Sequence, residues 1–231
     1  PEVAVRPAGE AQRWFDADID APDALSLVGF LDARFREPGN GPYRESLDEI
    51  ETRLEDAGFG ADERLLVERW TLDEDAPTWE PLAASLDVVS PVEERLLAFA
   101  PDDDWLRTML LIGSPGTSGP IEVDLGADGE ADPKGRAVLA RGLPEREYGR
   151  FADARAAVVL FTADERYEGP VADDGAVPFG EVEAREWGPV ALRLSRTAER
   201  RLRELLAGEE PVVLRVEASV REYIVHVVRA T

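Results

Sequence analysis

The sequence predicts an α+β fold, and three observations lead to that prediction. The last third of the chain alternates in type: strands at 136–141, 156–162, 189–194 and 211–218 are interleaved with helices at 144–155 and 195–207 and a polar, Gly-rich loop at 163–180. Near the N-terminus, two helices are joined by a turn rich in Gly and Pro. Between these regions, short apolar and alternating runs indicate further strands.

The strand at 156–162 is predicted from the short apolar run Val158, Val159, Leu160 and Phe161. This run is rich in β-branched and aromatic residues and is too short to form a helix of its own. A strand that is buried on both faces therefore fits it best.

The two helices of the last third carry end signals and an apolar stripe. Ser195 is placed to cap the helix at 195–207, and Gly208 is placed to end it. Pro144 suits the first turn of the other helix, where its missing N–H costs nothing. The buried face of the helix at 195–207 consists of residues at helical spacing: Ala198, Leu202, Leu205 and Leu206.

The N-terminal part is predicted to be a helical hairpin. The first helix begins near Pro22, and the turn at 38–42 ends it. The second helix runs from about 43 to 57, with Gly58 as the expected C-cap. The apolar faces are Leu27, Phe30, Leu31 and Phe35 in the first helix and Leu47, Ile50 and Leu54 in the second.

The middle of the chain is predicted to form short strands. They lie at 65–72, 82–89 and 121–125, with an apolar segment at 109–112 and a further alternating strand at 223–228. The stretch at 95–100 is either a strand or a short helical turn. We expect two units: residues 1–120 contain the hairpin and strands, and they pack on the second unit, residues 121–231.

Charge is the strongest compositional signal. The 231 residues include 49 acidic and 26 basic side chains, so the formal net charge is −23. The electrostatic field of so large a negative charge repels nucleic acids and anionic membranes, so neither is an expected partner. The acidic surface is either simply solvated or a patch that recruits cations or basic peptides. Lys134 is the single lysine; the arginine excess fits a GC-rich genome, and the acid excess fits a halophilic host.

Size and composition set the class of protein. A chain of this length holds one large or two small domains, and its apolar content of 44% supports a packed core. No apolar run approaches the length of a membrane span and no signal peptide is visible, so we expect a soluble protein of unknown compartment. Because cysteine is absent, disulfides, thiol catalysis and thiolate metal sites are excluded.

No catalytic, cofactor-binding or metal-binding residue is predicted. His226 is the only histidine, and its place in the alternating run at 223–228 indicates a partly buried strand residue. A Ser–His–Asp site would also need His226, and the chain has no G-x-S-x-G motif. Ser195 is explained better as a helix cap.

Other motifs that suggest a ligand site favour ordinary structure. The Gly-rich turn at 113–119 lacks the Gly-Lys-Ser/Thr ending of a phosphate loop and contains a proline. The run from Asp124 is similar to a calcium loop, but Gly126 takes a ligand position and Gly135 stands where the closing Glu is due. The triple aspartate at 102–104 is a cap or a loop, with loose cation binding as the alternative. Core or interface positions are expected for the scattered Trp70, Trp79, Trp105 and Trp187.

Four stretches of the last third resemble a protease-associated (PA) domain: 134–135 (KG), 156–161 (AAVVLF), 189–195 (PVALRLS) and 212–216 (VVLRV). The sequence departs from the family pattern at 146–148, where many members have a Cys/Ser-Phe stretch. It also departs at Arg155, which replaces the glycine usual before the buried strand. The resemblance implies a small, open β-barrel or sandwich flanked by two helices.

The helical hairpin carries a second resemblance, to the di-zinc aminopeptidases related to glutamate carboxypeptidase and the transferrin receptor ectodomain. Their pattern is a helix, an R-x-x-G-S/N-x-x-Y turn and a helix that ends in L-x-x-x-G followed by an apolar residue. The matching residues here are Arg36, Gly39, Tyr43, Leu54, Gly58 and Phe59. The stretch LLVERWTLDEDAPTWEPLAASLDVVSP resembles the strand that continues this element, and YIVHVVRAT resembles the strand that opens the catalytic domain. Two histidines help to bind zinc in that family, so the single His226 cannot complete such a site.

Together the resemblances imply a non-catalytic accessory portion of a di-zinc aminopeptidase, without the catalytic domain, that shapes substrate access or protein contacts. The chain is then a fragment or a protein that kept only this part. The expected partner is a peptidase catalytic domain or a protein or peptide ligand, with no cofactor. Two alternatives stay open: a free-standing acidic module that binds protein or peptide, with a groove along 163–180, and a hydrolase built from carboxylates alone.

Overall fold

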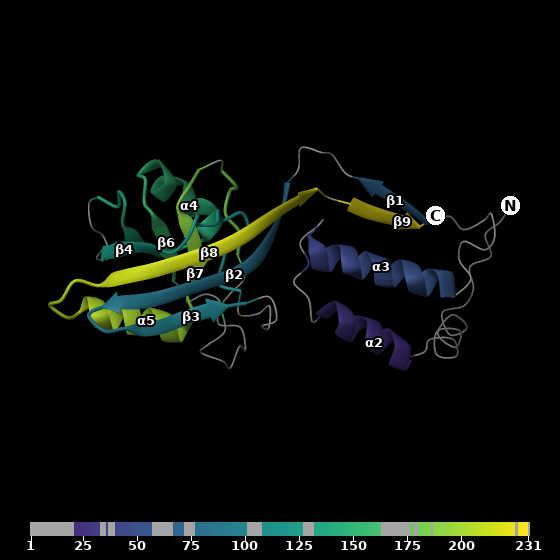
Figure 1. Cartoon of the computed structure of the whole chain (residues 1–231), viewed down its shortest axis with the longest axis horizontal. Helices are drawn as coiled ribbons and strands as arrows, with labels where there is room; N and C mark the ends of the chain where they lie inside the picture. Colours follow the sequence, from purple (N-terminus) through teal and green to yellow (C-terminus); the bar gives the residue numbers. More distant parts are fainter. Residues whose placement is uncertain are drawn as a thin grey trace, which may run out of the picture.

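A seven-stranded mixed sheet is the centre of the structure, which is a computed structural model (Figure 1). The structure describes residues 21–32, 36, 40–56, 67–71, 77–100, 108–126, 132–162, 177, 180–185, 187–224 and 226–230. The strands lie in the order β3-β2-β8-β4-β5-β6-β7. Helices and sheet together confirm the predicted α+β class, and the sheet is open rather than closed into a barrel.

The sheet has an antiparallel half and a parallel half. The antiparallel half contains β3 (Glu94–Phe99), β2 (Pro77–Ser90) and β8 (Val213–Ile224), and β8 also pairs with β4 (Ile121–Gly126). From β4 onward the ladder is parallel, through β5 (Ala137–Ala140), β6 (Val158–Phe161) and β7 (Val190–Arg193). Helix α4 (Pro144–Asp153) connects β5 to β6, and α5 (Arg196–Leu206) connects β7 to β8.

Alternation along β6 divides the core between these two helices. Successive side chains of a strand point to opposite faces of the sheet. Those at 158 and 160 pack in the cluster that contains Leu202 of α5, whereas those at 159 and 161 pack in the cluster that contains Tyr148 of α4. All four side chains of β6 are 0% exposed, which confirms the predicted strand buried on both faces.

The segment 109–112 covers the edge strand β7. The N–H of Leu111 donates to the carbonyl of Ala191 (3.1 Å), and the N–H of Arg193 donates to the carbonyl of Met109 (2.7 Å). These bonds satisfy main-chain groups that an edge strand would otherwise expose.

The turn at 113–119 continues from that edge to the other half of the sheet. The Ser114 hydroxyl accepts from the N–H of Ala191 in β7 (2.9 Å), and its carbonyl accepts from the indole of Trp79 in β2 (2.9 Å). Thr117 then binds β8: its N–H donates to the carbonyl of Ala218 (2.7 Å), and its hydroxyl accepts from the N–H of Ala218 (3.0 Å). The turn therefore ties β7 to the β2–β8 ladder by side-chain and main-chain hydrogen bonds.

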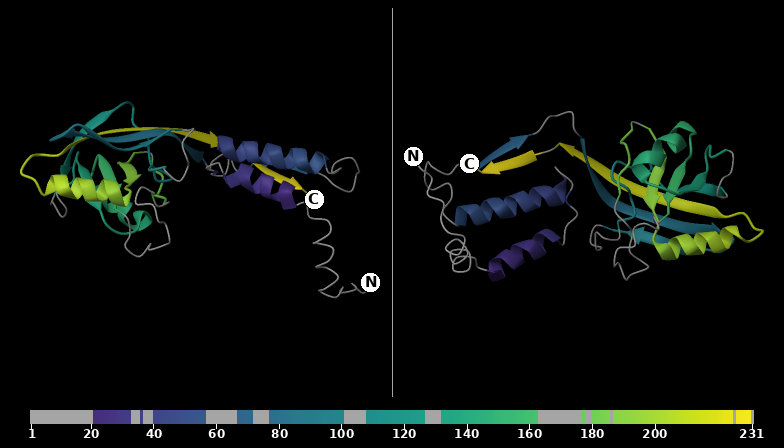
Figure 2. Two further views of the ribbon diagram at one scale, coloured as in Figure 1. Left: turned by 90° about the horizontal axis from the view of Figure 1, so that it is seen from below. Right: turned by 180° about the vertical axis from the view of Figure 1, so that it is seen from behind.

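The strands β2 and β8 form a long ribbon that reaches the N-terminal helices. Their register runs from Ser90↔Val213 to Pro77↔Ile224. The same two stretches of chain pair again where β1 (Val67–Thr71) meets β9 (His226–Ala230). Figure 2 shows α2 (Ala21–Asp32) and α3 (Gly41–Asp56) beside β1 and β9, away from α4 and α5. No helix in the described part of the chain combines the length and apolarity that a membrane span requires.

Helix α3 begins at Gly41, two residues before the predicted start at 43. Asn40 is the cap: its side-chain oxygen accepts from the N–H of Tyr43 (2.9 Å), and its carbonyl accepts from the N–H of Arg44 (3.0 Å). Asn40 is fully buried, and the carboxylate of Glu80 in β2 lies next to Gly41. A negative charge is favoured at this end of a helix, so Glu80 helps to hold α3 against the ribbon.

Three strand predictions differ in extent from the structure. β2 is longer than the predicted 82–89, because a register shift between Pro81 and Ala83 accommodates the proline within the ladder. β8 extends beyond the predicted end at 218, and the predicted strand 223–228 is divided between β8 and β9. The stretch at 95–100 is the strand β3. The boundary predicted near residue 120 falls between β3 and β4, which belong to one sheet, and it stays a prediction.

Candidate functional site

Three residues that the sequence analysis considered as possible catalytic or metal-binding residues, Ser195, His226 and Asp124, lie at a helix cap or within strands. Ser195 caps α5, since its hydroxyl accepts from the N–H of Ala198 (3.2 Å), which confirms that prediction. His226 pairs with Thr71 in the β1–β9 ladder. Asp124 and Gly126, proposed members of a calcium-like loop, lie in β4 and pair with Val213 and Val138.

Several other sequence-based interpretations fall outside the described residues. These are the triple aspartate at 102–104, Trp105, and most of the loop at 163–180. Within the residues that the structure does describe, no three His, Asp or Glu side chains are grouped in a way that could hold a metal ion.

The tryptophans separate into different environments. Trp79 is buried (8% exposed) and is part of the core, as predicted. Trp187 is 63% exposed and lies just before β7. Its indole therefore presents apolar surface to solvent.

A pocket of about 370 Å³ opens beside Trp187, where α4 ends and where β6 and β7 begin. This volume falls in the range of small-ligand sites. The lining residues are Ala152, Arg155, Ala156, Trp187, Gly188 and Pro189. We refer to it as the Arg155–Trp187 pocket.

The wall formed by Gly188 and Pro189 is held from behind by Tyr148 of α4. The Tyr148 hydroxyl donates to the carbonyl of Pro189 (3.0 Å), and the side chain is 1% exposed. A methyl group on Gly188 would collide with this hydroxyl, so the close approach requires glycine here. Burial raises the pKa of Tyr148 to about 12; the nearby Arg185 lowers it and Glu183 raises it further, both by smaller amounts. The phenol therefore stays protonated and keeps donating at neutral pH.

Arg155 adopts a left-handed backbone conformation, with φ of 60°. Its N–H donates to the carbonyl of Ala152 (2.9 Å), and its own carbonyl accepts from the N–H of Gly135 (2.9 Å). This backbone conformation is unfavourable for residues that have a Cβ atom, so a glycine would adopt it at lower cost. The two hydrogen bonds hold the backbone in this conformation and carry the arginine side chain to the pocket.

An ion-pair network fixes the segment next to the pocket. Arg185 lies 3.0 Å from the carboxylate of Asp153 at the end of α4 and 2.9 Å from that of Glu183. The hydrogen bond with Glu183, followed by that with Asp153, raises the pKa of the Arg185 guanidinium. Since these groups are exposed to water, their main effect is to position the segment 183–185 on α4.

One residue of this pocket stood out in the sequence, and the others did not. Arg155 stood out as the departure from a glycine in the PA pattern. Trp187 was assigned to a core or interface position, and the spacing between the two residues carries no periodicity. They meet because β6 and β7 are parallel neighbours, with Val158 opposite Val190, so the residues that precede both strands reach the same end of the sheet.

Comparison with known proteins shows that the fold of this chain is similar to that of two solved structures. No protein family model matches the chain, and no curated protein does. A peptidase M28 precursor from Shewanella amazonensis SB2B aligns with a TM-score of 0.62 and 17% identity, over 95% of this chain and 50% of that one. An aminopeptidase from Aneurinibacillus sp. strain AM-1 aligns with a TM-score of 0.50 and 14% identity, over 90% of this chain and 47% of that one. The chain thus spans about half the length of these structures and has a fold similar to that of the part it aligns with.

Proposed function

We propose that the chain is the non-catalytic accessory portion of an M28-like aminopeptidase, with a PA-like unit that shapes substrate access or protein contacts. One observation carries the proposal: 95% of the chain aligns with only half of the Shewanella amazonensis peptidase precursor. The element order β5-α4-β6-β7-α5-β8 supports it, because it follows the order that the PA resemblance implies.

The residue content of the chain also supports a non-catalytic role. A di-zinc site of this family's type uses two histidines, and the sequence has one, His226. The accessory portion would therefore act by its surface, next to a catalytic domain that supplies the metal ligands.

The test is zinc titration by calorimetry, together with assays on aminoacyl nitroanilides, at low and high salt. We expect neither stoichiometric zinc binding nor turnover, while a zinc aminopeptidase run in parallel shows both. High salt is included because the net charge of −23 attracts cations loosely at low salt, and screening removes that background. Stoichiometric zinc binding with turnover by the chain alone would contradict the proposal.

A free-standing module that binds protein or peptide is the second candidate. It is favoured by the Arg155–Trp187 pocket, because the residues that line it in the described part of the structure all belong to this chain. The two candidates can be distinguished by adding a peptidase catalytic domain to the chain. If the chain is an accessory portion, the catalytic domain should gain activity or change its substrate preference. If the chain is a free-standing module, the activity of the catalytic domain should not change.

A further inference from the structure

We propose that the Arg155–Trp187 pocket binds the carboxyl-terminal residue of a peptide, with the terminal carboxylate on Arg155 and an apolar last side chain against Trp187. This inference does not rest on the proposed function, because every residue that it uses belongs to this chain and can be tested without a catalytic partner.

The charge of Arg155 is not neutralised within the described structure. Other arginines are held by carboxylates at close range: Arg95 by Asp87 (2.7 Å), Arg201 by Glu94 (2.8 Å) and Arg215 by Glu122 (2.7 Å). Arg155 forms no ion pair with any described residue, although the chain has 49 acidic side chains. A guanidinium left open at a pocket in so acidic a protein is suited to a carboxylate from outside.

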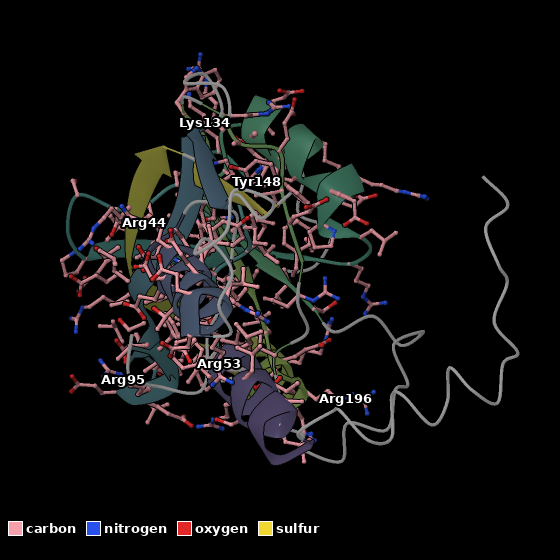
Figure 3. The ribbon with its side chains drawn as sticks, turned by 90° about the vertical axis from the view of Figure 1, so that its right-hand side faces the viewer. Arg44, Arg53, Arg95, Lys134, Tyr148 and Arg196 are labelled. Carbon is pink, nitrogen blue, oxygen red and sulfur yellow. The ribbon has the colours of Figure 1, made fainter. Side chains whose placement is uncertain are left out.

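A second cation lies at the same corner. Lys134 forms a β-bridge with Ala156, a pocket residue, and it too has no ion pair with a described residue. In Figure 3, Lys134 lies at the top with Tyr148 below it, and Arg95 and Arg196 lie near the bottom. The backbone of the chain's only lysine thus lies against the stretch that contains Arg155, and the carboxylate of Asp132 accepts the backbone N–H of Lys134 (3.1 Å).

The rest of the pocket is apolar and firmly supported. Trp187, Pro189, Ala152 and Ala156 offer carbon surface, and Tyr148 holds the Pro189 side in place. An indole packs well against an aliphatic or aromatic side chain. A pre-formed wall also costs little entropy on binding.

One carboxylate with one apolar side chain fits this site better than a polyanion does. A volume of about 370 Å³ accommodates a single residue rather than a long segment. The net charge of −23 repels ligands with many negative charges, whereas a single carboxylate gains a forked, charge-assisted pair with Arg155 at small cost.

The experiment uses the N-acetylated peptide Gly-Ser-Gly-Leu with a free carboxyl end, titrated by calorimetry. Its C-terminal amide and an amidated peptide with an internal Asp-Leu pair are the comparison ligands. We expect the free acid to bind about tenfold or more tightly than either, because only it places a carboxylate next to the last side chain. The indole N–H signal of Trp187, assigned by loss in Trp187→Phe, should shift on addition of the free acid.

Matched variants locate the contacts. Arg155→Gly removes the charge at a backbone conformation that glycine favours, so the fold is retained; affinity should fall about tenfold or more. Trp187→Ala should also weaken binding. Arg196→Gln, which removes an exposed charge on α5 far from the pocket, should leave affinity unchanged.

Three results would overturn the proposal. The first is no binding of the free acid at millimolar concentration, or equal binding of the amide. The second is unchanged affinity in a folded Arg155→Gly variant. The third is an equal loss in Arg196→Gln, which would mean that overall charge and not the pocket attracts the peptide.

Discussion

The hydroxyl of Tyr148 donates a 3.0 Å hydrogen bond to the carbonyl oxygen of Pro189, which joins α4 to the residue before β7. Both partners are buried. Tyr148→Phe removes the donor and leaves the carbonyl unpaired, so we expect the free energy of unfolding to fall by about 1–2 kcal/mol. Urea unfolding should show a lower midpoint with an unchanged slope. Tyr43→Phe on α3 is the control and should change stability by less than about 0.5 kcal/mol.

The same phenol predicts a loss of stability in alkali. The pKa of Tyr148 is about 12 in the folded chain, above the usual value of about 10 in the unfolded chain. Its contribution is complete below about pH 10 and is lost as the pH rises through about 12, because only the unfolded chain releases the proton in that window. Unfolding midpoints measured across this window should fall more steeply for the parent than for Tyr148→Phe. Parallel curves would contradict the assignment, since the other tyrosines and the basic side chains are common to both proteins.

Gly188 and Tyr148 should be energetically coupled. A Cβ at residue 188 would collide with the Tyr148 hydroxyl, so Gly188→Ala should destabilise the fold by about 1–3 kcal/mol. In the Tyr148→Phe background the obstructing oxygen is gone, and the cost should be clearly smaller. A double-mutant cycle by urea unfolding measures this coupling, and strictly additive effects would argue against the contact.

Arg155→Gly should stabilise the fold while it removes a pocket residue. Its φ of 60° costs about 1–2 kcal/mol for a residue with a Cβ. Part of that gain is offset by the greater freedom of glycine in the unfolded chain, which leaves an expected net gain of about 0.5–1 kcal/mol. Arg155→Ala removes the same charge without relieving the backbone and should show no such gain in thermal unfolding. An equal gain in both variants would mean that charge, and not conformation, is responsible.

Asn40 should determine the start of α3. Asn40→Ala removes the acceptor for the N–H of Tyr43 and should cost about 1 kcal/mol, with faster amide exchange in the first turn of the helix. Asn40→Ser keeps a side-chain acceptor without adding a buried charge next to the carboxylate of Glu80, so it should retain most of the stability. Faster exchange in both variants alike would show that the cap is not the stabilising contact.

Local signals were enough to predict the core elements of the sheet but not their tertiary partners. The apolar run of β6 and the cap at Ser195 depend on neighbouring residues, and both are confirmed. The start of α3 was missed although Asn40, followed by Pro42 in the first turn, is an ordinary start signal. Strand β2 was predicted only over 82–89, because the sequence alone does not show the partner strand β8, against which a bulge in β2 after Pro81 continues the ladder.

The pocket was harder to predict for a related reason. Arg155 could be noticed as a departure from glycine, but its unpaired charge and its nearness to Trp187 depend on the parallel register of β6 and β7. The Gly-rich turn at 113–119 was correctly described as a turn, yet its hydrogen bonds to both β7 and β8 connect residues far apart in the sequence.

The pairing of β1 with β9 can form only late during synthesis of the chain. The ladder joins Val67 to Ala230 and Thr71 to His226, so β1 is made well before β9. Contacts between such distant segments form slowly, and N-terminal segments leave the ribosome first. The ladder between β1 and β9 can therefore close only after translation has delivered β9, and until then β1 lacks the partner with which it pairs in the structure.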